Sequence, residues 1–179
     1  ARDAIVQTNV RRLDLLPGGM ELAHADLVLA DVPGREHRLK ESLAPVVSEY
    51  DTILCDCAPS LSMLPVNTLL AADGYLVPLS PEHLAFEGLN SLMQAVALIE
   101  EGMQVELKLL GIVFTMVLDV RFPSFHRGVR DQREIIERVQ ARYGADVFRT
   151  MISRDPALAR SPASAITVAE AAPKSRGAR

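Results

Sequence analysis

Residues 52–60 place a single carboxylate between an apolar run and a turn. Residues 52–55 are of low polarity, Asp56 follows them, and Pro59 and Ser60 form the turn. Such a run is typical of a strand buried on both faces of a parallel sheet. A carboxylate at the end of this strand would emerge at the edge where open α/β sheets bind ligands, and it suits Mg²⁺ held directly or through water. The alternative is an aspartate that only caps the next helix.

Other side chains that could take part in catalysis or metal binding are few and scattered. The two cysteines, Cys55 and Cys57, favour a reduced, cytoplasmic protein, and a C-x-C metal site is disfavoured because the four histidines form no cluster with them. His83 and Glu87 are four residues apart, which indicates a contact on a helix surface. No G-x-S-x-G motif is present, so hydrolase chemistry by a serine triad is not supported.

Composition and charge restrict the possible partners. The chain has 179 residues, 49% of them hydrophobic, and a formal net charge of −4, so contact with a polyanion would need a local basic patch. No apolar run approaches the roughly 18 residues of a membrane span, and no signal peptide opens the chain. These features predict a soluble, cytoplasmic protein without membrane contact.

The elements that would position Asp56 alternate between strands and helices. This alternation predicts one α/β domain over residues 1–179, with a mainly parallel sheet flanked by helices in three layers. Pro45 is expected to kink or split one of the helices. The expected strands are 13–16, 52–56, 74–79, 107–117, 147–152 and a short one at 166–168. The expected helices are 20–31, 35–50, 62–72, 80–101 and 124–142.

Arginines are concentrated between residues 121 and 142. Arg127, Arg130 and Arg133 share one broad helical face, which would suit DNA phosphates bound without sequence preference. The alternative is a solvated face with internal ion pairs at i,i+3 and i,i+4, each worth only about 0.2–0.5 kcal/mol.

Six segments occur in a recognisable order along nearly the whole chain. They are 35–40 (REHRLK), 56–61 (DCAPSL), 78–88 (PLSPEHLAFEG), 111–116 (GIVFTM), 152–162 (ISRDPALARSP) and 173–177 (PKSRG). In this order they resemble motifs of the ParA family, the deviant-Walker ATPases that partition plasmids and chromosomes. Their joint extent over the chain makes the resemblance specific.

The resemblance implies roles for particular residues. Asp56 would be the Walker B aspartate that holds the water shell of Mg²⁺, and Pro59 and Ser60 would belong to switch II. The residues that would border the adenine are Thr115, Met116, Ser153, Arg154 and Asp155, for which ordinary core and loop packing is the alternative. The residues that would contact DNA are Arg121, Arg127, Arg130, Arg133 and Arg160.

The resemblance also implies a mode of action. A P-loop NTPase-like protein of this family would bind ATP or ADP with Mg²⁺, form a homodimer and bind nucleoid DNA non-specifically. A ParB-type partner protein would stimulate ATP hydrolysis and release the DNA.

The P-loop motif of the family is missing from this sequence. The lysines are Lys40, Lys108 and Lys174, and none of them lies in G-x-x-x-x-G-K-[ST]. We therefore expect a portion of such an ATPase, incomplete at the N-terminus and lacking the last helix, that hydrolyses little ATP by itself. One alternative is a P-loop-less, non-catalytic module that binds DNA or a partner. Another is a MinD-like positioning ATPase, for which residues 172–179 offer no amphipathic membrane helix.

Overall fold

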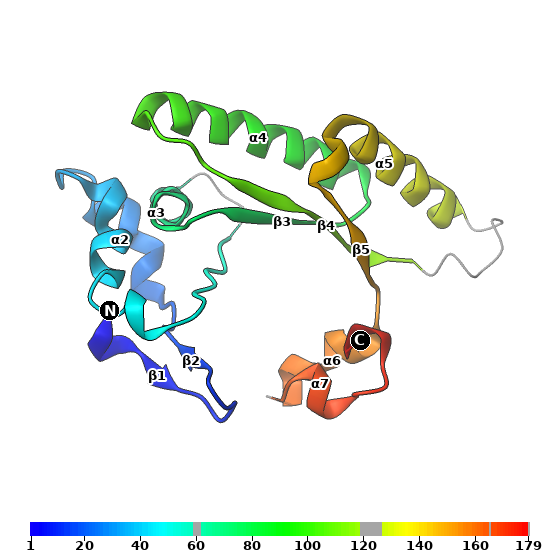
Figure 1. Cartoon of the computed structure of the whole chain (residues 1–179), viewed down its shortest axis with the longest axis horizontal. Helices are drawn as coiled ribbons and strands as arrows, with labels where there is room; N and C mark the ends of the chain where they lie inside the picture. The colour runs from blue at the N-terminus through cyan, green and yellow to red at the C-terminus, as the bar shows by residue number, and fades with distance from the viewer. Residues whose placement is uncertain (59–61, 119–126, 165, 179) are drawn as a thin grey trace. The chain divides into compact units, whose positions relative to one another are not determined.

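The computed structural model describes residues 1–58, 62–118, 127–164 and 166–178. The chain forms two compact units, residues 1–74 with 102–107 and residues 75–101 with 108–179, and each is considered by itself. The chain is an α/β protein with a parallel three-stranded sheet flanked by helices (Figure 1). Among the described residues, no helix is long and apolar enough to cross a membrane.

The first unit consists of a small hairpin and short helices. Pro45 lies just after α2 and has no backbone N–H to continue the helical hydrogen bonds, so the expected helix over 35–50 is split there and resumes only as the 3₁₀ turn Val47–Glu49. The expected helix over 20–31 is likewise a 3₁₀ turn followed by one turn of α-helix. The elements are β1 (Val6–Gln7) antiparallel to β2 (Asp14–Leu15), α1 (Ala25–Val28), α2 (Arg38–Leu43), α3 (Met63–Ala71), and 3₁₀ turns at Arg2–Ala4, Met20–His24, Arg35–His37 and Val47–Glu49.

Two polar side chains fix α3 within this unit. Asp26 accepts a hydrogen bond from the backbone N–H of Met63 through Oδ1 at 2.7 Å, which satisfies a free donor at the start of the helix. Asn67 is 2% exposed and accepts from the N–H of Leu39 at 3.0 Å. Its amide nitrogen donates to the carbonyl of Arg35 at 2.9 Å and to that of Met63. Asn67 therefore joins α3 to the turn that leads into α2.

We expect Asn67→Ala to lower the free energy of unfolding of the first unit by about 2–3 kcal/mol, because the N–H of Leu39 and the carbonyl of Arg35 lose their buried partner. Urea unfolding followed by the amide signals of α2 and α3 measures this loss. The control is Asn9→Ala, which removes an exposed asparagine side chain in the same unit. Equal losses for the two variants would contradict the assignment.

The prediction of a buried strand at 52–56 is wrong. Residues 51–58 form no strand, and the side chain of Leu54 is 90% exposed. A strand is stabilised by the ladder of its neighbours, and residues 52–58 pair with no other strand among the described residues. An apolar run in this chain therefore forms a strand only where another strand is available to pair with it.

The second unit contains the three-stranded sheet. All pairings are parallel and the strand order is β3-β4-β5, so both helical connections advance in the same direction across the sheet. Right-handed crossovers then place both connecting helices on one face, as Figure 1 shows for α4 and α5. The elements are β3 (Tyr75–Leu79), α4 (His83–Met103), β4 (Leu109–Val117), α5 (Arg127–Tyr143), β5 (Val147–Ser153), α6 (Pro156–Ser164) and α7 (Val168–Ala171).

The hydrophobic core lies between this sheet and the two helices. Phe114 and Ile112 at the centre of β4 and Val139 on α5 are completely buried. The guanidinium of Arg138 on α5 lies 4.7 Å from the ring centre of Phe86 on α4, a cation–π contact that joins the helices above the sheet. The buried core residues are Val77, Leu79, Phe86, Leu89, Ile112, Phe114, Val117, Ile135 and Val139.

The predicted short strand at 166–168 is also wrong, because Thr167 begins a helix. Its hydroxyl accepts a hydrogen bond from the N–H of Glu170, and the Glu170 side chain accepts one from the N–H of Thr167. This reciprocal capping box starts α7. A further 3₁₀ turn, Arg176–Ala178, follows.

Candidate nucleotide and DNA-binding sites

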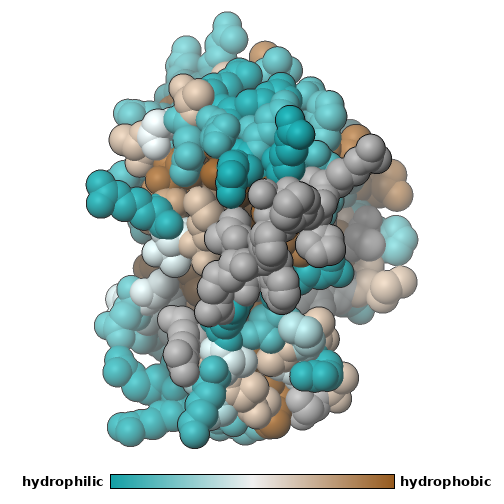
Figure 2. Space-filling view, turned by 90° about the vertical axis from the view of Figure 1, so that its right-hand side faces the viewer, coloured by the Kyte–Doolittle hydropathy of each residue, from teal (hydrophilic) through white to brown (hydrophobic). Residues whose placement is uncertain are grey.

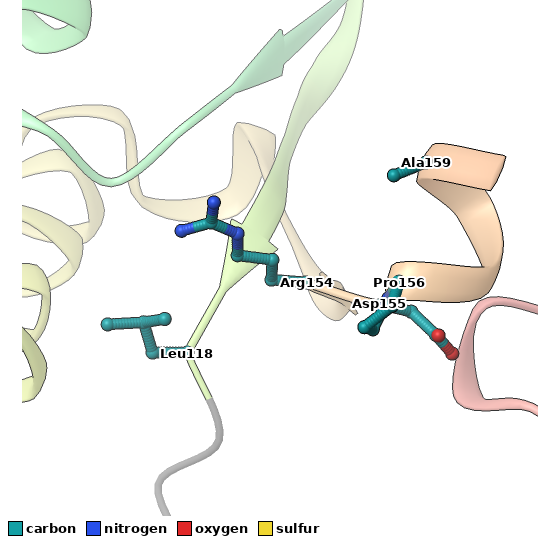
Figure 3. A pocket seen from close by; sticks show the side chains of 5 residues that line it. All are labelled: Leu118, Arg154, Asp155, Pro156 and Ala159. Atoms are coloured by element: carbon teal, nitrogen blue, oxygen red, sulfur yellow. The ribbon is translucent and has the colours of Figure 1, made fainter.

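An open pocket of about 400 Å³ lies where β4 and β5 end (Figure 3). Leu118 and Arg154, which follow the two strands, line it together with Pro156 and Ala159 of α6 and with Asp155. The backbone N–H of Arg154 donates to the carbonyl of Val117 at 2.9 Å, so the two strand ends are held together at the pocket mouth. Ligands bind at this edge in open α/β sheets.

The guanidinium of Arg154 is the positive group of the pocket. Figure 3 shows it extending away from the carboxylate of Asp155. It makes no hydrogen bond or ion pair with another described residue. A free guanidinium beside the apolar surfaces of Leu118, Pro156 and Ala159 can stack on a planar ring and donate to acceptors on its edge.

A bulge in β4 precedes the pocket. Phe114 pairs with Met151 and Val117 with Ser153, so three steps along β4 match two steps along β5. Met116 has a φ of 55°, which is uncommon for a residue other than glycine, and its side chain is 61% exposed. The bulge therefore turns the Met116 side chain outward immediately before the strand end, a device that recurs next to functional sites. The sequence pattern did not predict this bulge.

Asp155 uses both carboxylate oxygens for contacts within the protein. Oδ1 accepts from the N–H of Ala157 at 2.8 Å, and Oδ2 accepts from the N–H of Gly177 at 2.9 Å. These backbone hydrogen bonds, the one from Ala157 first, hold the pKa of Asp155 below its usual value. The carboxylate is therefore ionised at neutral pH, and both of its oxygens already have protein donors.

Asp56 belongs to the first unit, whereas the residues that line the pocket belong to the second. It is exposed, and its carboxylate makes no hydrogen bond or ion pair with another described residue. Pro59 and Ser60 lie outside the described residues. Across the described ranges, no group of three or more histidine, cysteine, aspartate or glutamate side chains could enclose a metal. The described side chains around Asp56 therefore do not form a set of three or more such ligands.

The arginines predicted to contact DNA are distributed over two helices. Arg130 and Arg133 are exposed on α5 and make no ion pair with a described acid, so the internal pairs expected of a solvated face are not formed. Arg160 is exposed on α6. Arg127 begins α5, and Arg121 lies outside the described residues. Figure 2 shows hydrophilic residues dominating the upper part of that view, over α5.

Comparison with known proteins gives the family. A family model described as "AAA domain" matches residues 1–109. The sporulation initiation inhibitor protein Soj of Bacillus subtilis is 35% identical over 176 residues, which cover 98% of this chain and 66% of Soj. The chain belongs to the ParA/Soj family of ATPases. The chromosome partitioning protein ParA of Myxococcus xanthus is 36% identical over 155 residues, which cover 87% of this chain and 52% of that protein.

A solved structure supports the same assignment of the fold. Cobyrinic acid a,c-diamide synthase from Mycobacterium smegmatis, with a bound ATP analog and magnesium, has a TM-score of 0.77 and 30% identity. The similarity covers 99% of this chain and 62% of that chain. This ParA/Soj-family chain therefore spans about half to two thirds of the length of the proteins it matches.

Proposed function

We propose that this chain supplies the base-binding pocket, the Walker B aspartate and the DNA-binding helix of a ParA-type partition ATPase. The observation that carries the proposal is the pocket at the ends of β4 and β5, which Arg154 lines together with Leu118, Pro156 and Ala159. The Arg154 guanidinium has no hydrogen-bond or ion-pair partner among the described residues. In the intact protein, Mg·ATP would drive homodimer formation and non-specific DNA binding. A ParB-type partner would stimulate hydrolysis, and the protein would act in the cytoplasm on the nucleoid.

The described residues fit a nucleotide with Mg²⁺. Leu118, Pro156 and Ala159 offer apolar surface to a base, and Arg154 offers a planar cation. Thr115, Met116 and Ser153 would border the base at the strand ends, with Asp155 beside it. An Asp56 carboxylate without a partner among the described residues suits an ion that keeps several waters, which is how Mg²⁺ is commonly held. When bound, Mg²⁺ would neutralise phosphate charge, and Pro59 and Ser60 would follow the phosphate end as switch II.

The exposed arginines of α5 support the DNA part of the proposal. Arg130 and Arg133 present guanidinium groups that no described acid neutralises. Such groups bind the phosphates of any DNA sequence and release counterions, so the affinity would fall steeply with salt. Arg121, Arg127 and Arg160 would extend this surface.

We predict that this chain turns over little or no ATP, because the sequence contains no G-x-x-x-x-G-K-[ST] motif to hold the phosphates. Phosphate release from Mg·ATP is measured with and without DNA, and Asp56→Ala serves as the background control. Turnover comparable to that of an intact ParA/Soj relative would contradict the proposal.

A non-catalytic module that binds DNA or a partner is the second candidate, and the missing P-loop motif favours it. The two candidates differ in how DNA binding responds to nucleotide. For a part of an ATPase, restoring a lysine-containing glycine loop upstream of residue 1 would make DNA binding depend on ATP. For a module, the affinity for DNA would be the same with and without that loop.

A further inference from the structure

We propose that Asp155 and Gly177 form a clasp that positions the first turn of α6, and with it the wall of the base pocket. In this assignment Asp155 is a positioning residue: both of its carboxylate oxygens accept from backbone N–H groups, and it acts on a ligand through Pro156 and Ala159. The ligand part of the inference rests on the proposed nucleotide function, whereas the clasp stands on contacts within the chain.

The first support is the reach of the Asp155 carboxylate. Its bond to the N–H of Ala157 is local, as expected for an aspartate at the start of a helix. Its bond to the N–H of Gly177 spans 22 residues and connects the start of α6 to the final turn of the chain. Figure 3 shows the carboxylate directed toward this later segment and away from Arg154. An aspartate that only capped α6 would need only the hydrogen bond from the N–H of Ala157.

The second support is the fit of Gly177 against α6. A Cβ atom at Gly177 would lie 2.5 Å from Leu158 Cγ and 2.7 Å from Leu158 Cδ1. Separations below 3.0 Å require one of the two groups to move. All of these atoms belong to the Leu158 side chain, so a larger side chain at 177 would require Leu158 to change its rotamer or α6 to shift. With Leu158 in its present rotamer, only glycine fits at position 177.

The third support is the fixed position of the residue before the clasp. The backbone N–H of Arg154 donates to the carbonyl of Val117, which holds the residue before the clasp at the end of β4. Pro156 and Ala159 line the pocket and follow on α6, so their position relative to the strand ends depends on how α6 is held. In this proposal the clasp sets that position.

Amide hydrogen exchange and methyl NMR of the whole chain test the clasp without any ligand. In Asp155→Ala, the Gly177 amide should exchange roughly fivefold faster, as expected when a hydrogen bond worth about 1 kcal/mol is lost. Asp155→Asn should keep partial protection, because its carbonyl oxygen still accepts one bond. The Ala159 methyl signal should move in Asp155→Ala and in Gly177→Ala.

The matched control is Glu170→Ala, which removes a side chain that caps α7 but does not line the pocket. It should leave the Ala159 methyl signal and the Gly177 amide unchanged. A Gly177 amide that exchanges equally fast in wild type and Asp155→Ala would overturn the clasp. An Ala159 signal that Gly177→Ala leaves in place would overturn its role at the pocket.

Adenosine titration then tests the link to the proposed function. Affinity should fall in Asp155→Ala and Gly177→Ala, recover partly in Asp155→Asn and stay unchanged in Glu170→Ala. Failure of the wild-type chain to bind adenosine would overturn the base-pocket proposal, while the exchange and methyl results still decide the clasp. Binding that Asp155→Ala leaves intact would overturn the positioning role alone.

Discussion

Replacing Phe114 with alanine should lower the free energy of unfolding of the second unit by about 3–5 kcal/mol. Phe114 is completely buried at the centre of β4, between the sheet and the helices α4 and α5. Its truncation removes the contacts of a whole ring and leaves a cavity that the surrounding core fills only in part. Because domains are stable by only about 5–15 kcal/mol, a loss of this size exposes much of the chain to unfolding at 37 °C.

Leu110→Ala on the same strand is the control for Phe114→Ala. Leu110 is 51% exposed, so its truncation should cost less than about 1 kcal/mol. Urea unfolding monitored by circular dichroism compares the two variants with wild type. Similar losses in both would show that the core does not lie between β4 and the two helices.

Reversing two charges on α5, in the double variant Arg130→Glu with Arg133→Glu, should weaken DNA binding roughly 100-fold at low salt. The affinity depends on salt because each neutralised phosphate releases counterions. Removing two phosphate contacts should therefore reduce the slope of log affinity against log salt by about 1.8. Fluorescence anisotropy with labelled DNA duplexes of different sequence measures both quantities.

The matched control changes the net charge by the same amount in the first unit, with Arg11→Glu and Arg12→Glu. These side chains are exposed, and Arg12 pairs with Asp51 at 2.8 Å. If the effect is local to α5, the control should retain most of the wild-type affinity and nearly the same salt slope. An equal loss in both double variants would mean that only net charge matters and that α5 is not the DNA surface.

Sequence patterns predicted the sheet of the second unit because its signals are local and agree with one another. The strands over 75–79, 109–117 and 147–153 and the helices between them lie close to the expected ranges. Ser80-Pro81-Glu82 gave a clear helix start, and α4 begins at the next residue. The run at 52–56 had the same apolar character, yet it forms no strand, because strand formation also requires a neighbour that the run itself does not specify.

The candidate site was predicted only in part. Arg154 and Asp155 were expected near a base through the family resemblance, and both line the pocket. Leu118 and Ala159 were missed, since their places depend on the bulge in β4 and on the setting of α6. The role of Gly177 was also missed, because a bond that spans 22 residues leaves no local pattern. Thr167 and Glu170 did carry a readable capping signal, which the β-branched residues 166–168 obscured.

The most direct test of the account compares the binding of adenosine and Mg·ADP to this chain, followed by the methyl signals of Leu118 and Ala159. The account predicts weak binding of both ligands with similar affinity, because the chain offers a base pocket but no P-loop motif. Arg154→Ala should abolish the ligand-induced shifts of both methyl signals, and Asp56→Ala should leave the affinity for adenosine unchanged. No binding of adenosine to the wild-type chain, or adenosine binding that Arg154→Ala leaves intact, would contradict it.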